Sequence, residues 1–503
     1  MKKNLLPSKT ISELLNISLK KNPNYIVYKI KKKNITKIQL IEKILKVRGG
    51  LSKKGLKKGD KVVSVLDNSF EQIILFFACV TLGVIWVPLG SERKGLGLDY
   101  IINKVKPKII FSENKKPKNL PTKLISKVLK INENLKNIEY KKKNFELLDQ
   151  HETACILFTS GTTGPPKGVM VSQKMLLVSA YATGIAAKIN YKDKLFLWES
   201  MHHIGGLQLI ILFLLNDFYL IISKKFSAKK FWIDIRRHKI TKIHYLGGIL
   251  DILLKLKKNK KDKKHNVKLA FGAGCSAITY SRFKKRFNIP LREVYGMTEA
   301  SSFTSINFNN KKDSIGKPLP WFKVNIKKIK NKKNIGEIII KEKEFGLITK
   351  GYFEDKLATN TLLKKDGLHT GDLATKDKNN NLYYIGRLKD SVRVKGENIS
   401  AWEIETTLNK NKNISESAIL GVKAEIGENE IAAFLVPKIK KIKIKELINS
   451  YKKEFSKLYL PRYWTFINKF PRTTTLRVDK KNIKINSYRF YDSLNDDFIK
   501  IEN

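Results

Sequence analysis

The chain has 503 residues, of which 42% are hydrophobic and 10% aromatic, and its formal net charge is +55. A chain of this length is too long for a single hydrophobic core, so we expect two or more domains. The apolar fraction excludes a disordered chain and indicates a globular protein with a large interior.

The positive charge has two interpretations, a polyanion-binding surface or a compositional bias. Only 13 of the 100 basic residues are Arg, and the lysines occur with Asn and Ile, as in "KKKNITKIQL". Dedicated nucleic-acid sites rely on Arg, because its planar guanidinium pairs with phosphates and base edges. We therefore favour compositional drift and expect no specific nucleic-acid partner, although polyanions should bind weakly and in a salt-dependent manner.

The three cysteines, Cys79, Cys155 and Cys275, are far apart and form no CxxC pair. This spacing argues against disulfides or a zinc site and favours a reducing compartment. The N-terminus "MKKNLLPSKT" lacks the apolar core of a secretory signal. We expect a cytoplasmic protein.

Helices and strands alternate in the first part of the chain. We expect strands at 61–68, 84–89 and 108–113, with helices at 70–83 and 98–106. The apolar run Ile73–Leu89 reaches the lower limit for a membrane span. Gly83 and Pro88 interrupt it, so it predicts a buried helix and strand, and we expect no transmembrane segment.

The alternation continues through segments at 154–159, 174–188, 194–200, 206–215, 218–223, 231–238, 242–247 and 267–274, with a solvated lysine loop at 255–264. From about Gly336 the sequence predicts short strands and turns, and residues 403–456 are predicted to form a small α+β unit. We predict an α/β fold. A large N-terminal domain, 1–388, has parallel sheets covered by helices, and a small mobile C-terminal domain spans 389–503.

The loop "SGTTGPPKG", Ser160–Gly168, follows one of these strands. Its glycines tolerate positive φ and expose their N–H groups, while its hydroxyls and Lys167 add donors and a charge. That combination suits a polyphosphate. The Walker pattern is excluded because no Ser or Thr follows Lys167. Alone, such a sequence is more often an ordinary turn.

Three further segments accompany the loop: "VYGMTEAS" from Val294, "HTGDLA" from His369, and "YIGRLKDSVRVKGENISAWEIE" from Tyr384. In this order, from about residue 40 to 484, the chain resembles the AMP-forming adenylating enzymes, and within them the acyl-CoA synthetases. The resemblance implies ATP, Mg²⁺ and coenzyme A as cofactors. A carboxylic acid would react with ATP to give acyl-AMP and pyrophosphate, and a thiol would then displace AMP after the C-terminal domain rotates.

The resemblance also implies residue roles. The β- and γ-phosphates would contact Ser160, Gly161, Thr162, Thr163, Gly164 and Lys167. Tyr295 and Gly296 would contact adenine, which Gly272, Ala273 and Gly274 would border. Thr298 would contact the α-phosphate, Glu299 would bind Mg²⁺, and Asp372 and Arg387 would hold the ribose. Lys389 is at the hinge position, and Arg393 and Gly396 would face the thioester-forming cleft.

The segment "SMHHIGG", Ser200–Gly206, resembles the family's acyl-pocket segment, and His203 matches its His or aromatic gate. Two adjacent histidines could also be metal ligands, but neighbours rarely reach one ion and no Cys or Asp cluster accompanies them. The Asp of amino-acid-activating relatives is absent from this segment, which argues against an α-amino acid substrate.

The sequence departs from the family near its end. The expected Pro-x-x-x-x-Gly-Lys is "PRTTTLR", in which Leu476 replaces the glycine and Arg477 the catalytic lysine. Three hypotheses follow: an active ligase that uses Arg477, an enzyme specialised for thioester formation from acyl-AMP, or a non-catalytic nucleotide binder. We favour the first. The acyl acceptor would be coenzyme A or a separate carrier protein.

Overall fold

The computed structural model describes residues 6–30, 33–91, 93, 96–113, 128–130, 145, 148–159, 166–329, 334–388, 391–394, 397–422, 429–439, 442–452, 454–455, 459–473 and 476–501. The chain packs into two compact units. The first unit comprises Met1–Lys323 with Ile340–Leu368, and the second comprises Val324–Ile339 with His369–Asn503. Each unit is described by itself. The predicted boundary between 388 and 389 stays a prediction.

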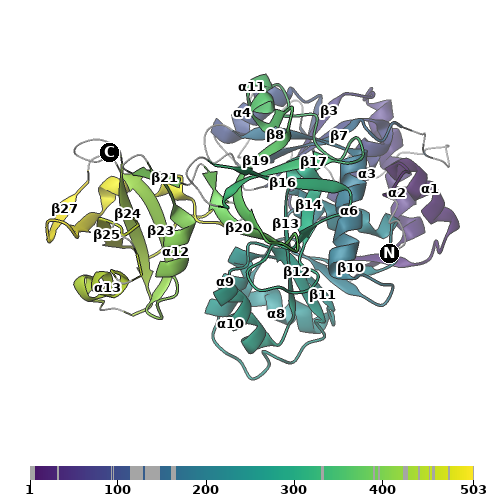
Figure 1. The fold of residues 1–503 in the computed structure, drawn as a ribbon. Helices are drawn as coiled ribbons and strands as arrows, with labels where there is room; N and C mark the ends of the chain where they lie inside the picture. The colour runs from purple at the N-terminus through teal and green to yellow at the C-terminus, as the bar shows by residue number, and fades with distance from the viewer. Residues whose placement is uncertain are drawn as a thin grey trace. The chain divides into compact units, whose positions relative to one another are not determined.

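Two sheets form the centre of the first unit (Figure 1). The larger has the order β15-β14-β13-β12-β11-β9-β10-β1-β2. Its strands are β1 Ile26–Ile30, β2 Lys33–Thr36, β9 Lys194–Leu197, β10 Tyr219–Ile222, β11 Lys242–Leu246, β12 Leu269–Ala273, β13 Leu291–Met297, β14 Ser302–Ile306 and β15 Lys317–Pro318. The strands from β13 to β1 are parallel, as predicted, whereas β2, β14 and β15 are antiparallel additions.

The second sheet has the order β6-β5-β3-β4-β7-β8. Its strands are β3 Lys61–Val65, β4 Ile85–Leu89, β5 Ile109–Ser112, β6 Val128–Lys130, β7 Thr153–Thr159 and β8 Lys167–Ser172. All are parallel except β8, which forms a hairpin with β7.

The helices of the first unit are α1 Ile11–Lys20, α2 Lys37–Lys53, α3 Phe70–Leu82, α4 Leu96–Val105, α6 Gln173–Ala187, α7 Ile204–Ile211, α8 Ala228–Arg237, α9 Gly247–Lys255, α10 Ala277–Phe287 and α11 Lys356–Leu362. The apolar run that reached the membrane-span limit is α3 followed by β4. Ser69 caps the start of α3, and Gly83 ends it at φ +74°, a conformation that glycine adopts without strain. Among the described residues, every helix is too short or too polar to cross a bilayer.

The second unit contains most of β16 Phe322–Lys328, β17 Gly336–Glu342, β19 Gly367–Lys376 and β20 Leu382–Arg387. The hairpin β21 Ser391–Val394 and β22 Glu397–Ser400 follows, and then the sheet β23-β24-β25-β26-β27. The bounds of that sheet and its helices are β23 Ile414–Val422, β24 Glu430–Pro437, β25 Tyr463–Phe466, β26 Arg489–Asp492, β27 Asp497–Lys500, α12 Ala401–Leu408 and α13 Ile444–Tyr451. Trp464 and Phe434 belong to two separate core clusters of this sheet. The predicted small α+β unit is therefore present.

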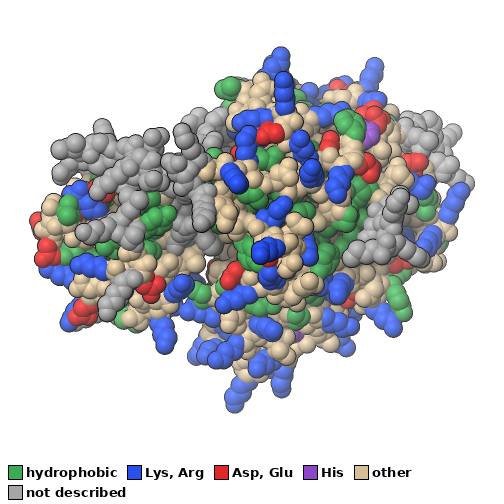
Figure 2. Space-filling view, in the orientation of Figure 1, with side chains coloured by type: hydrophobic (Ala, Val, Ile, Leu, Met, Phe, Trp, Pro, Cys, Tyr) green, Lys and Arg blue, Asp and Glu red, His purple; other side chains and the backbone are tan. Residues whose placement is uncertain are grey.

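Lysines occur throughout the sequence. On the face that Figure 2 shows, Lys and Arg side chains are scattered and do not gather into one patch. A dedicated polyanion site would concentrate positive charge on one surface. The interpretation of the charge as compositional bias stays a prediction.

Candidate active site

The predicted site segments of the first unit lie at or just after the carboxyl ends of β7, β9, β12 and β13, where ligands bind in open α/β sheets. The predicted phosphate loop joins β7 to β8. Thr159 pairs with Lys167 at the base of this hairpin, while Ser160, Gly161, Thr162, Thr163 and Gly164 lie outside the described residues. Lys167 is the first residue of β8, and its Nζ lies over the Tyr352 ring, 5.1 Å from the centroid.

The "YGMTE" segment forms the end of β13 and the 3-10 turn Thr298–Ala300. Tyr295 and Glu299 are buried. Gly296 is required by packing, because an added Cβ would lie 1.5 Å from the carbonyl oxygen of Ser302. The Tyr352 hydroxyl donates to Oε1 of Glu299 at 2.8 Å. Lys167, the predicted phosphate ligand, and Glu299, the predicted metal ligand, therefore share one aromatic neighbour.

That neighbour lies on Leu347–Phe353, a segment that we call the strap. The strap follows β8 through hydrogen bonds from Met170 N to Gly351 O (3.2 Å) and from Phe353 N to Gly168 O (2.7 Å). Thr349 N donates to the Glu299 carbonyl at 2.8 Å. The strap therefore binds both β8 and the 3-10 turn.

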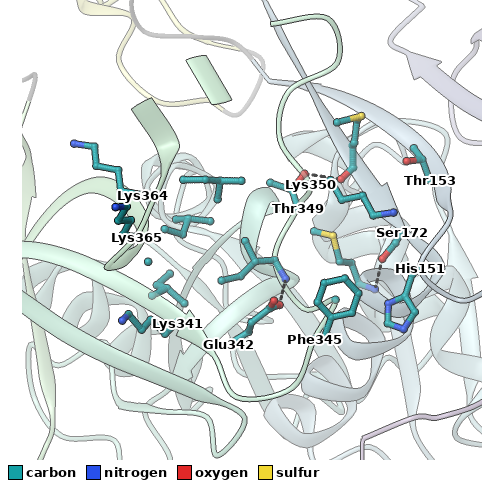
Figure 3. A pocket seen from close by; sticks show the side chains of 18 residues that line it. His151, Thr153, Ser172, Lys341, Glu342, Phe345, Thr349, Lys350, Lys364 and Lys365 are labelled. Atoms are coloured by element: carbon teal, nitrogen blue, oxygen red, sulfur yellow. Dashed lines mark hydrogen bonds between the residues drawn. The ribbon is translucent and has the colours of Figure 1, made fainter. Parts of the chain in front are cut away.

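One side of the strap lines a cavity of about 360 Å³ (Figure 3). Within it the Thr349 hydroxyl donates to the Met170 carbonyl, and Glu342 accepts the N–H groups of Leu347 and Ile348. These bonds fix the backbone that carries Tyr352.

The predicted adenine border, Gly272–Gly274, is held by a residue that the sequence analysis missed. Glu293 of β13 accepts hydrogen bonds from Gly274 N (2.6 Å), Cys275 N (3.1 Å) and the Tyr245 hydroxyl (2.6 Å). Burial raises the pKa of Glu293 to about 7, and these three hydrogen bonds oppose the rise. An acid two residues before Tyr295, in a largely buried strand whose only other charged residue is Arg292, was the available signal.

The predicted acyl-pocket segment follows β9 and is fixed by Asn68, a residue that the sequence analysis also missed. Asn68 Nδ2 donates to the carbonyls of Glu199 (2.8 Å) and Ser223 (3.2 Å), and Oδ1 accepts from Met201 N (3.0 Å). His203 begins α7 as its N-terminal cap residue. A buried Asn with three such bonds joins the ends of β3, β9 and β10.

His202 and His244 each contact a residue of the predicted acyl-pocket region. His202 Nδ1 lies against the Ser200 hydroxyl, and burial, reinforced by the charge of Arg93, lowers the pKa of His202 to about 4, with Asp67 opposing. Nδ1 of buried His244 lies 2.9 Å from Oε2 of buried Glu199. In the described part of the chain no three His, Cys, Asp or Glu side chains gather as a metal site.

In the second unit, β19 and β20 pair Asp372 directly with Arg387. Arg387 Nε donates to Asp372 Oδ1 at 2.9 Å, and the Asp372 side chain is buried. Gly371, at φ +69°, precedes Asp372 and donates its N–H to Glu337. The two predicted ribose residues are therefore neighbours.

The other predicted residues of this part of the chain are only partly described. Arg393 lies on β21, whereas Lys389 and Gly396 lie outside the described residues.

The divergent Arg477 lies in a tight turn of the second unit. Arg472 and Val478 form a bridge across the turn, and Leu476 adopts φ +62°. The Arg477 side chain is exposed. Lys480, the lysine nearest in sequence, forms a salt bridge with Glu405, with 2.6 Å between Nζ and Oε1.

A family model described as AMP-binding enzyme matches residues 15–353, and one described as AMP-binding enzyme C-terminal domain matches residues 403–476. The chain belongs to the AMP-binding enzyme family. This confirms the resemblance that the sequence motifs suggested. The predicted boundary at 388/389 falls between the two matched ranges.

Relatives of this family member cover nearly its whole length. The 2-succinylbenzoate–CoA ligase of Bacillus cereus (strain Q1) is 25% identical over 470 residues, covering 92% of this chain and 96% of the relative. The crotonobetaine/carnitine–CoA ligase of Salmonella paratyphi B is 25% identical, covering 86% and 89%.

Solved structures share the fold. The O-succinylbenzoate coenzyme A synthetase of Bacillus subtilis, in complex with AMP, matches with a TM-score of 0.82 at 22% identity, covering 94% of this chain and 98% of that one. ATP-bound MatB of Rhodopseudomonas palustris matches with a TM-score of 0.85 at 22% identity, with the same coverage. The predicted α/β fold with a smaller C-terminal part is confirmed.

Proposed function

We propose that this AMP-binding enzyme is an AMP-forming carboxylic acid–CoA ligase. In the first step a carboxylate oxygen attacks the α-phosphorus of ATP and the bond to pyrophosphate breaks. In the second step the thiol of coenzyme A loses its proton, its sulfur attacks the acyl carbon, and AMP leaves. The relatives named above are CoA ligases, which supports this reaction class.

The observation that carries the proposal is the position of Glu299, a buried carboxylate at the end of β13, joined through Tyr352 to the strand that begins with Lys167. A single carboxylate fits Mg²⁺, which keeps several waters and binds substrate phosphates. Glu299 would hold the ion, and Lys167 would contact the phosphates with Ser160, Gly161, Thr162, Thr163 and Gly164. When bound, Mg²⁺ would neutralise phosphate charge.

The remaining roles follow the same assignment. Thr298 would contact the α-phosphate, Tyr295 and Gly296 the adenine beside Gly272–Gly274, and His203 the acyl group. Asp372 would accept the ribose hydroxyls, with Arg387 fixing its orientation, since Arg387 donates to one of its two oxygens. Lys389 would be the hinge, Arg393 and Gly396 would serve the thioester step, and Arg477 would bridge the substrate carboxylate and α-phosphate.

The substrate would be a small-molecule carboxylic acid, and the acceptor coenzyme A, with a separate carrier protein as the alternative. The proposed compartment is the reducing cytoplasm, because the described cysteines are all free, and burial raises the thiol pKa of Cys79 and Cys155.

The half-reactions test the proposal separately. Pyrophosphate release is measured with ATP, Mg²⁺ and a panel of carboxylic acids, and thioester formation with synthetic acyl-AMP plus coenzyme A or a carrier protein. Both activities are expected with at least one acid. ATP binding without either activity would exclude the ligase and leave a nucleotide binder, whereas thioester formation alone would indicate the specialised enzyme.

A further inference from the structure

Tyr352 contacts both charged groups of the proposed phosphate and metal site. Its ring faces the Lys167 ammonium at 5.1 Å, and its hydroxyl donates to Glu299 Oε1 at 2.8 Å. The negative face of an aromatic ring attracts a cation, and a hydrogen bond to a charged carboxylate is stronger than one between neutral groups. One side chain therefore stabilises two opposite charges through two different parts of the same ring.

We propose that Tyr352 is a positioning residue that sets the separation between the Lys167 ammonium and the Glu299 carboxylate. The inference rests on the proposed function, in which these groups contact phosphate and Mg²⁺. Opposite charges in a partly buried site attract each other strongly and tend to form a direct pair. Tyr352 gives the Lys167 ammonium and the Glu299 carboxylate an uncharged partner in place of each other. These contacts hold both groups in position without neutralising their charges, so both can act on the ligand.

The backbone of Tyr352 is fixed independently of its hydroxyl. Tyr352 N donates to the Thr359 hydroxyl at 2.9 Å, Val169 pairs with Tyr352, and Phe353 N donates to Gly168 O. Gly351, at φ +130°, is packed against Thr359, so that an added Cβ would lie 2.4 Å from Thr359 Cγ2. Removing the hydroxyl should therefore leave the strap in place.

Two variants separate the two contacts. Tyr352→Phe keeps the ring beside Lys167 and removes the hydroxyl that donates to Glu299. Tyr352→Leu removes both. The matched control is Tyr191→Phe, because Tyr191 is an exposed tyrosine of the first unit outside the proposed site.

Titration calorimetry of ATP binding at varied Mg²⁺ supplies a readout other than turnover. For Tyr352→Phe we expect the Mg²⁺ concentration for half-maximal ATP binding to rise about 10-fold, with ATP affinity at saturating Mg²⁺ unchanged. For Tyr352→Leu the ATP affinity itself should fall by about 3- to 10-fold, because the Lys167 ammonium loses its contact with the aromatic ring. The control should match wild type in both quantities.

Urea unfolding of each variant separates positioning from stability. The proposal is overturned if Tyr352→Phe requires no more Mg²⁺ than wild type. It is also overturned if both variants lose ATP affinity at saturating Mg²⁺ in proportion to the decrease in their urea unfolding midpoints. That result would show that Tyr352 has a purely structural role. A wild-type chain that binds no Mg²⁺·ATP would instead overturn the proposed function, and this inference with it.

Discussion

The backbone N–H of Thr473 donates to the carbonyl of Arg477 at 2.9 Å, and the N–H of Arg477 donates back to the Thr473 hydroxyl at 3.2 Å. This reciprocal pair closes a turn whose other constraint is Leu476 at φ +62°. The turn keeps at Leu476 a conformation that favours glycine. Loss of the family glycine has therefore not removed the left-handed backbone before Arg477.

Arg477→Ala should reduce pyrophosphate release about 100-fold, because removal of one donor to a developing charge typically costs ~2.7–4 kcal/mol. Thioester formation from synthetic acyl-AMP should be retained, since its assigned residues are different. Arg489→Ala, another exposed arginine of the second unit, is the matched control. Unchanged pyrophosphate release in Arg477→Ala would show that the assignment of Arg477 is wrong.

Leu476 should tolerate glycine but resist a β-branched residue. A left-handed non-glycine residue costs roughly 1–3 kcal/mol. Leu476→Gly should change the free energy of unfolding by less than about 1 kcal/mol, because relief of this strain offsets the added chain entropy. Leu476→Val should destabilise by about 1–2 kcal/mol, because branched residues are true outliers at positive φ. Urea denaturation measures both, and equal stability of the valine variant would contradict the reasoning.

Asp372→Asn should raise the KM for ATP about 10- to 100-fold, because the buried carboxylate that Arg387 orients would become a neutral amide. The KM for the carboxylic acid should change much less. Steady-state kinetics with each substrate varied in turn measures the difference. Asp497→Asn, at an exposed strand start, should behave like wild type. An unchanged KM for ATP would exclude Asp372 from nucleotide binding.

Glu293 should make folding stability pH-dependent. Its folded-state pKa of about 7 exceeds the ordinary 4.5. Between these values the folded state binds more protons than the unfolded state, so the free energy of unfolding falls as pH rises. The contribution is present below about pH 4.5 and lost through about pH 7, on the order of 3 kcal/mol.

Denaturant unfolding from pH 4 to 8 measures this contribution as the difference in unfolding free energy between wild type and Glu293→Gln, whose amide does not titrate. His202, with its lowered pKa of about 4, gives a slope of opposite sign over the same range, and this slope cancels in the difference because both proteins contain it. The exposed Glu446→Gln should match wild type at every pH. A difference that does not change with pH would contradict the assignment to Glu293.

Asn68→Ala should raise the KM for the carboxylic acid more than the KM for ATP, because it releases the backbone of Glu199 and Met201 next to His203. The loss of buried bonds should also destabilise the chain by about 1–3 kcal/mol. Asn259→Ala, in the exposed lysine loop, is the control. Equal changes in both KM values would indicate a purely structural Asn68.

The order of elements along the chain followed from hydrophobic periodicity, because that signal is local. The helix α3 and strand β4 lie where the apolar run and its Gly83 predicted them. The motifs around Lys167, Glu299 and Asp372 were also legible, since each is a short contiguous stretch. They led to the correct family and fold class.

Only the tertiary structure decided which distant residues share a contact. Tyr352 meets Glu299 because the strap returns along β8, and Asn68 reaches Met201 because β3 ends near the segment after β9. In both pairs the two residues are far apart in the sequence. Side-chain contacts of this kind depend on which strand ends lie together, and that is set by packing summed over the whole unit.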